Sequence, residues 1–200
     1  MNAEEHQKRG VEYFNQNDFD QAITHFAEAL RLDPNVKAVK DDLAVAYYSR
    51  GVAYLNKGDS DRAIADITKA ISLNPDDIDF YRARGYIYGL SKNHDGVIED
   101  FANAIRLDPN DGSNYFKRGD AYREKGKEAR LAGNDDDGSN FLKYTNLAIK
   151  DLTNGLGKSF TGENSEQLRE LYKKMLDVLI KERDCRKEVY NSDLLKHGKL

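Results

Sequence analysis

The sequence predicts an all-α fold made of repeated helical hairpins, and three observations lead to this prediction. First, Gly10, Gly51 and Gly85 are each followed by Tyr three residues later and by Ala nineteen residues later. Second, Gly51 and Gly85 lie 34 residues apart, a period typical of helical repeat proteins. Third, the three prolines each stand at the same distance after one of these glycines, where proline would end a helix.

This spacing resembles the tetratricopeptide repeat, a helix–turn–helix unit of about 34 residues. The markers read G-x-x-Y, then A-x-x-x-F as in Ala22 and Phe26, then a closing proline. The chain departs from the family in having no Trp, and Arg precedes each repeat glycine; we expect the charged end of this arginine to lie in water. The resemblance implies an α-α superhelix, or solenoid, of four repeats over residues 1–160, and a capping helix with a loose tail over 161–200. The repeats are expected at about 3–36, 37–77, 78–111 and 112–160.

The segment that leads from the first repeat into the second is longer than the one that leads from the second into the third. In the first repeat we expect helices over Ala3–Gln16 and Phe19–Leu32, with Asp18 as the N-cap of the second helix. The first and second prolines are farther apart than the second and third by seven residues, and these extra residues keep helical spacing. We therefore predict one long helix over about Val36–Asn56, projecting about 10 Å beyond its neighbours.

The fourth repeat carries an insertion of seventeen residues between Tyr122 and Ala148, where the second-helix pattern resumes. We expect both of its helices to lengthen and to meet at the polar sequence GNDDDGSN. Asn164 and Gln167 then form a capping-box pattern that begins a final helix. This helix is expected to cover the exposed face of the last repeat. Its predicted apolar stripe consists of Leu168, Leu171, Met175, Val178 and Leu179.

Charge and composition disfavour several classes of protein. A net charge of −4 and a pI near 5.6 disfavour nucleic-acid binding, which requires a clustered basic face. No apolar stretch approaches the ~18 residues of a membrane span, and the N-terminus lacks the apolar run of a signal peptide. Cys185 is the only cysteine, so an intrachain disulfide is impossible. We therefore expect a cytoplasmic protein.

Motifs for chemistry are incomplete. The segment NGLGKS at residues 154–159 is similar to the end of a phosphate-binding loop, but Leu152 stands where that loop requires glycine. The acidic stretch Asp135–Gly138 lacks the ligand spacing of a calcium loop. The four histidines form no pair on one helix face; we expect His6 to pack and the others to lie at the surface. We treat Cys185 as passive. We expect no catalytic residue, no metal site and no cofactor.

The resemblance also implies where a partner would bind. In this family the first helix of each repeat lines a concave groove, with the side chains three before, one after and four after the glycine facing it. Such a groove suits a peptide or amphipathic helix of a protein partner, so we expect a protein-interaction scaffold or adaptor. Packing against neighbouring helices is the alternative for Phe14 and Leu55. The groove candidates are Gln7, Val11, Phe14, Tyr48, Val52, Leu55, Arg82, Tyr86, Gly89, Phe116, Asp120 and Arg123.

Two further hypotheses concern the partner. Members of the family that grip the acidic C-terminus of heat-shock chaperones use a clamp of Lys, Asn and Arg side chains. The matching positions here hold none of these residue types, so we do not expect a chaperone peptide as the partner. The alternative function is a self-assembling scaffold that forms homo-oligomers through the long second-repeat helix or the insertion. The clamp positions are Gln7, Val11, Ser49, Asp79 and Ala83.

Overall fold

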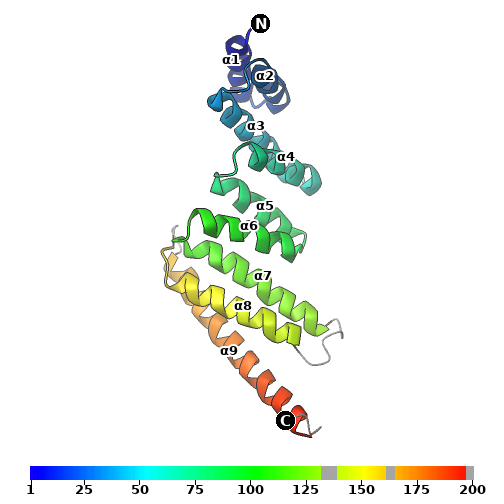
Figure 1. Ribbon diagram of the computed structural model, residues 1–200, viewed down its shortest axis with the longest axis vertical. Helices are drawn as coiled ribbons and strands as arrows, with labels where there is room; N and C mark the ends of the chain where they lie inside the picture. The colour runs from blue at the N-terminus through cyan, green and yellow to red at the C-terminus, as the bar shows by residue number, and fades with distance from the viewer. Residues whose placement is uncertain (132–138, 161–164, 197–200) are drawn as a thin grey trace. The chain divides into compact units, whose positions relative to one another are not determined.

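The computed structural model describes residues 1–131, 139–160 and 165–196, with side chains up to Val189. Regular structure in these residues is helical apart from an isolated bridge between Asp111 and Ser159, so the predicted all-α class is confirmed (Figure 1). The helices are α1 (Ala3–Asn15), α2 (Phe19–Leu32), α3 (Lys37–Asn56), α4 (Ser60–Leu73), α5 (Ile78–Leu90), α6 (His94–Leu107), α7 (Gly112–Leu131), α8 (Ser139–Leu156) and α9 (Ser165–Lys196).

The chain divides into two compact units. Unit 1 covers Met1–Leu90 with α1 to α5, and unit 2 covers Ser91–Leu200 with α6 to α9. Within each unit, helices that follow one another along the chain pack against each other. Unit 1 therefore contains the hairpins α1–α2 and α3–α4 followed by α5. Unit 2 contains α6, the hairpin α7–α8, and α9.

Glycine in the first helix of a hairpin permits the close approach of the second. A Cβ added to Gly10 would lie 2.6 Å from the ring of Phe26 on α2, and one added to Gly51 would lie 2.9 Å from Cγ1 of Ile67 on α4. A side chain at either position would push the two helices apart or distort them. Phe26 and Ile67 are buried, so the recurring small and apolar residues form the predicted core.

The turns before α2, α4 and α6 share a left-handed residue that the sequence analysis did not identify. Asn17, Gly58 and Lys92 each stand seven residues after a repeat glycine and adopt φ values of 60°, 80° and 56°. The residue that follows each of them caps the next helix. At Asp18 the side chain accepts a hydrogen bond from the backbone N–H of Gln21 at 3.1 Å, which confirms the predicted N-cap.

The long helix of the second repeat is present, but its extra turns are packed. α3 begins one residue after the predicted start and ends at the predicted residue. Val39 and Leu43, in its first two turns, are buried in a cluster with Phe26 of α2. The expectation that these extra turns project beyond the neighbouring helices is therefore wrong, because their apolar side chains pack against α2.

The insertion lengthens both helices of the fourth repeat, as predicted. α7 has 20 residues and α8 has 18, whereas α6 has 14. Gly119 lies against α8, where Ala148 is completely buried, so the second-helix pattern resumes where the spacing indicated. Residues 133–138 of the predicted polar tip lie outside the described residues, as does the predicted cap Asn164.

The final helix covers the fourth repeat along a line that differs from the predicted stripe. Tyr172, Leu176 and Leu179 of α9 pack onto a core that includes buried residues of α7 and α8. Leu171 and Val178, which we placed in the stripe, are 58% and 54% exposed, so that part of the prediction is wrong. Tyr172, the residue after Leu171, faces the core instead, so the buried side of α9 is turned away from the predicted stripe.

Candidate partner-binding face

The first helices of unit 1 carry most of the predicted groove positions. On α1, α3 and α5 these positions recur at spacings of three and four residues, which places them on one side of each helix. Val11, Val45 and Tyr86 on this side are 41%, 42% and 54% exposed, although their side chains are largely apolar. We call this surface the A-helix face. It consists of Gln7, Val11, Val45, Tyr48, Val52, Arg82 and Tyr86.

Residues three positions before a repeat glycine join successive first helices. Gln7 on α1 donates a hydrogen bond from Nε2 to Oδ2 of Asp42 on α3 at 3.0 Å. The ring of Tyr48 on α3 lies 5.1 Å from the ring of Phe80 on α5. Gln7 and Tyr48 are only half-buried, so they hold neighbouring helices together and also form part of the surface.

Two groove candidates of unit 1 are mainly packing residues. Phe14 packs against the cluster between α1, α2 and α3, with its ring 5.6 Å from the ring of Phe19. Leu55 packs against the cluster between α3, α4 and α5. The packing alternative therefore describes both residues better than the groove assignment.

Carboxylates lie around the beginning of α5. Nη1 of Arg82 is 3.5 Å from Oδ1 of Asp79, and Oδ1 of Asp77 accepts a hydrogen bond from the backbone N–H of Asp79 at 3.0 Å. Burial raises the pKa of the Tyr48 hydroxyl, and the negative charges of Asp79 and Asp77 raise it further. The Tyr48 hydroxyl therefore remains protonated at neutral pH and lies in the field of both carboxylates.

The groove candidates of unit 2 make contacts within that unit. Phe116 is completely buried, and its ring stacks on Tyr172 of α9 at a centroid distance of 3.4 Å and an interplanar angle of 6°. Nη2 of Arg123 lies 2.6 Å from Asp120 Oδ1 and 2.7 Å from Glu124 Oε1. Because α9 covers Phe116, this side chain offers no surface to a partner, and we do not retain it as a groove residue.

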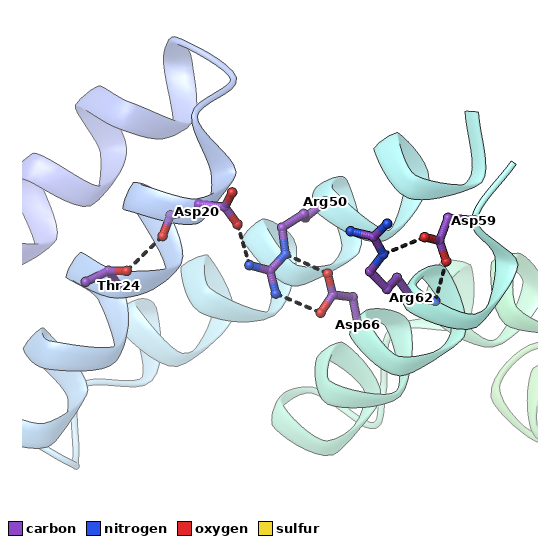
Figure 2. A network of polar contacts seen from close by, with 6 residues as sticks. All are labelled: Asp20, Thr24, Arg50, Asp59, Arg62 and Asp66. Carbon is purple, nitrogen blue, oxygen red and sulfur yellow. Dashed lines mark hydrogen bonds and ion pairs between the residues drawn. The ribbon is translucent and has the colours of Figure 1, made fainter. Parts of the chain in front are cut away.

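An ion pair between helices, missed by the sequence analysis, links three helices of unit 1. Figure 2 shows Arg50 of α3 between Asp66 of α4 and Asp20 of α2. Arg50 donates to the two carboxylate oxygens of Asp66 at 2.7 and 2.9 Å, and to Asp20 at 2.6 Å. These hydrogen bonds, with Asp66 the larger contributor, raise the pKa of Arg50. The expectation that this arginine ends in water is therefore wrong, because a buried carboxylate lies opposite it.

The fourth repeat makes the same pair. Arg118 donates to the two oxygens of Asp151 at 2.7 and 2.8 Å. Asp66 stands sixteen residues after Arg50. Asp151 stands thirty-three residues after Arg118, which is also sixteen once the seventeen inserted residues are left out. The signal available in the sequence was an aspartate at a fixed distance from the arginine before the glycine. The first hairpin departs from it, since sixteen residues after Arg9 stands His25.

The first hairpin contains a histidine pair instead. Nδ1 of His6 and Nδ1 of His25 are 3.0 Å apart, and the ring of His25 stacks on Tyr13 at a centroid distance of 5.4 Å. His25 is half-buried, so its predicted surface position is wrong. The two residues are far apart in sequence, and only the packing of α1 on α2 brings them together.

The remaining candidate motifs form no centre in the described part of the chain. Over those residues, no group of three or more His, Cys, Asp or Glu side chains is placed to hold a metal ion. The segment at 154–159 contains the end of α8, and Cys185 is exposed on α9. The acidic stretch Asp135–Gly138 and His197 lie outside the described residues. Among the helices described, none is both long and apolar enough to cross a membrane.

The fold and its recurring glycines define a helical repeat protein built from successive helical hairpins. The family model for the tetratricopeptide repeat matches residues 3–36 and 44–77. These two matches cover 68 of the 200 residues and lie in unit 1, so residues 3–36 and 44–77 are similar to tetratricopeptide repeats; the residues between the two matches are the first two turns of α3. This repeat fold supports a role as a scaffold for protein–protein interaction, and proteins of this kind are in general not enzymes.

Solved structures agree with this fold. A tetratricopeptide repeat protein from Parabacteroides merdae ATCC 43184 is similar to the chain with a TM-score of 0.52 and 15% identity, over 96% of this chain and 66% of the other. A structure of MamA (AMB-1) is similar with a TM-score of 0.51 and 15% identity, over 95% and 90% of the two chains. At this identity the likeness concerns the fold alone. No curated protein matches the sequence.

Proposed function

We propose that unit 1 is a protein-interaction module that holds a peptide or helix of a partner on the A-helix face, so that the protein acts as a scaffold or adaptor. The observation that carries this proposal is the exposure of Tyr86, which is 54% accessible on the same side of α5 as Arg82. Tyrosine combines a large apolar ring with a hydroxyl and is a frequent anchor residue at protein interfaces.

The packing beneath this surface supports the proposal. The contacts from Gln7 to Asp42 and from Tyr48 to Phe80 hold α1, α3 and α5 against one another. A surface fixed in this way loses little conformational entropy on binding, which favours affinity.

The proposal is tested by affinity capture from a native lysate with the full chain as bait. The double variant Tyr86→Ala with Val52→Asp removes the exposed ring and places a charge among the apolar side chains of the A-helix face. We expect it to lose the captured partner while its circular dichroism stays that of the parent chain. The matched control is Leu32→Ala, which truncates a side chain of similar exposure on α2. Unchanged capture by a folded double variant would show that another surface binds.

Self-assembly is the second candidate function, and the exposed side of α9 favours it. Leu171 and Val178 are seven residues apart and more than half exposed, and Val189 is 45% exposed. In a second copy the same side of α9 would cover them. Light scattering over a concentration series tests this: a dimer that Leu171→Glu dissociates supports the candidate, and a monomer at every concentration excludes it.

A further inference from the structure

Carboxylates gather at one edge of the A-helix face. α1, α3 and α5 alternate with α2 and α4 in successive hairpins, so all three begin at the same edge of unit 1 (Figure 1). Apolar side chains occupy the middle of the face, with Val11, Val45 and Val52 among them. The carboxylates at its edge are Glu4, Asp41, Asp42, Asp77 and Asp79.

Cations are fewer at this edge. Arg82 is engaged by Asp79 at 3.5 Å. Lys37 and Lys40, in the first turn of α3, line a hollow together with Asp77 of the loop before α5. Lys8 of α1 stands four residues after Glu4, so five carboxylates face four cations, and the edge carries a small excess of negative charge that attracts positive charge.

Aromatic rings stand close to these carboxylates. Tyr48 lies in the field of Asp77 and Asp79, and its ring meets Phe80 at the beginning of α5. Tyr86 follows Asp79 by two helical turns on the same side of α5. A lysine or arginine placed here can lie over a ring face and pair with a carboxylate at the same time.

We propose that the segment bound by the A-helix face is an amphipathic peptide or helix that carries lysine or arginine beside its apolar side chains. This inference rests on the proposed function and adds the charge of the partner. The apolar side chains contact the stripe of Val11, Val45 and Val52, and the cationic ones meet Asp77 and Asp79. An acidic segment is disfavoured, because like charges facing each other across an interface cost free energy.

Binding of designed peptides to the full chain tests the proposal. Three fluorescein-labelled amphipathic peptides share leucines at helical spacing and carry Lys, Gln or Glu at every polar position. Fluorescence anisotropy at low salt is expected to give the tightest binding for the Lys peptide, about tenfold tighter than for the Glu peptide. The difference shrinks as salt rises, because exposed charges are screened.

Charge variants assign the preference to this edge. The double variant Asp77→Asn with Asp79→Asn keeps side chains of the same shape, and asparagine retains the hydrogen bond that Asp77 accepts. We expect it to reduce the preference for Lys over Glu at least threefold, because the Lys peptide loses an attraction and the Glu peptide loses a repulsion. The matched control is Glu28→Gln with Asp61→Asn, which removes the same charge from α2 and α4, where Asp61 is exposed and Glu28 is partly exposed and paired with Arg31.

The outcomes separate this inference from the proposed function. Tyr86→Ala is expected to weaken all three peptides, since it removes a shared apolar anchor. If Tyr86→Ala weakens binding but the Glu peptide binds as tightly as the Lys peptide, the inferred charge is wrong and the face remains the binding site. The inferred charge is also wrong if Asp77→Asn with Asp79→Asn changes the preference for the Lys peptide no more than the control variant does. If none of the peptides binds in a way that depends on Tyr86, the proposed function fails and the inference fails with it.

Discussion

Phe116 of α7 and Tyr172 of α9 stack face to face at 3.4 Å. Phe116 stands three residues before a repeat glycine, and in unit 1 the residues at that position contact the following first helix. Tyr48 contacts Phe80 of α5 in this way. The final helix therefore occupies, within unit 2, the position that the first helix of a further repeat would take. This arrangement explains how α9 covers the apolar side of the fourth repeat.

This stack predicts that Phe116→Ala destabilises unit 2 by about 3–5 kcal/mol, the cost typical of truncating a buried phenylalanine. Tyr172→Phe keeps the ring and is expected to cost less than about 1 kcal/mol, since only the hydroxyl is lost. Urea denaturation followed by circular dichroism measures both. Leu171→Ala is the control on the same helix, because its side chain is 58% exposed. Equal losses for Phe116→Ala and Leu171→Ala would contradict this account of α9.

The repeat register predicted the helices well, because each marker acts within one hairpin. Gly10 and Phe26 meet inside the first hairpin, so their spacing reports a local contact that recurs. The candidate site was harder to predict. An offset of three residues before the glycine fixes the side of the helix, but it does not tell whether solvent or another helix lies opposite. Phe116 was placed in a groove for that reason, and α9 covers it.

The ion pair of Arg50 with Asp66 illustrates the second limit. The arginine before the glycine was visible in each repeat, but its partner lies on another helix and is recognised only when both positions are compared across repeats. The histidine pair gave no such signal, since His6 and His25 occur once. Contacts between helices that do not repeat cannot be read from a period.

The Arg50 pair leads to a prediction about stability. Arg50→Ala leaves the carboxylate of Asp66 buried without its bidentate donor, and we expect a loss of about 2–4 kcal/mol. This lies at the lower end of values for buried pairs, because the Arg50 side chain is 21% exposed. Arg62→Ala is the matched control, since its pair with Asp59 lies at the surface at the start of α4, where solvent screens it, and a smaller loss is expected. Denaturation midpoints that fall equally for both would contradict a structural role for the Arg50 pair.

Two glycines in the same register are predicted to respond in opposite ways to alanine. Gly58 stands seven residues after Gly51 and forms a turn at φ 80°, so Gly58→Ala is expected to cost about 1 kcal/mol. Gly126 stands seven residues after Gly119, but the insertion places it inside α7. A Cβ there meets no atom closer than 3.5 Å, so Gly126→Ala should stabilise the protein by about 0.5–1 kcal/mol. Thermal denaturation of the two variants tests both expectations. A loss of stability for Gly126→Ala would show that the neighbours of Gly126 cannot accommodate a methyl group.

His25 leads to a prediction about pH. Its Nδ1 lies 3.0 Å from that of His6, a contact that needs one donor and one acceptor and is lost when both rings are protonated. Burial lowers the pKa of His25, and the charges of His6 and Arg9 lower it further. The unfolded chain therefore binds this proton more readily than the folded chain. The contribution of His25 to the free energy of unfolding is complete above about pH 6.5 and decreases as the pH falls below it.

The variant His25→Gln removes this contribution together with the coupling between His25 and His6, because glutamine does not titrate. We expect the difference in urea midpoint between the parent chain and His25→Gln to decrease between about pH 7.5 and about pH 5.5. His25→Asp places a carboxylate sixteen residues after Arg9, in the register of Asp66 and Arg50, and should raise the midpoint at neutral pH. A difference between parent and His25→Gln that does not change with pH would show that the proton on His25 is not linked to folding. In that case the histidine pair would contribute to the packing of α1 on α2 alone.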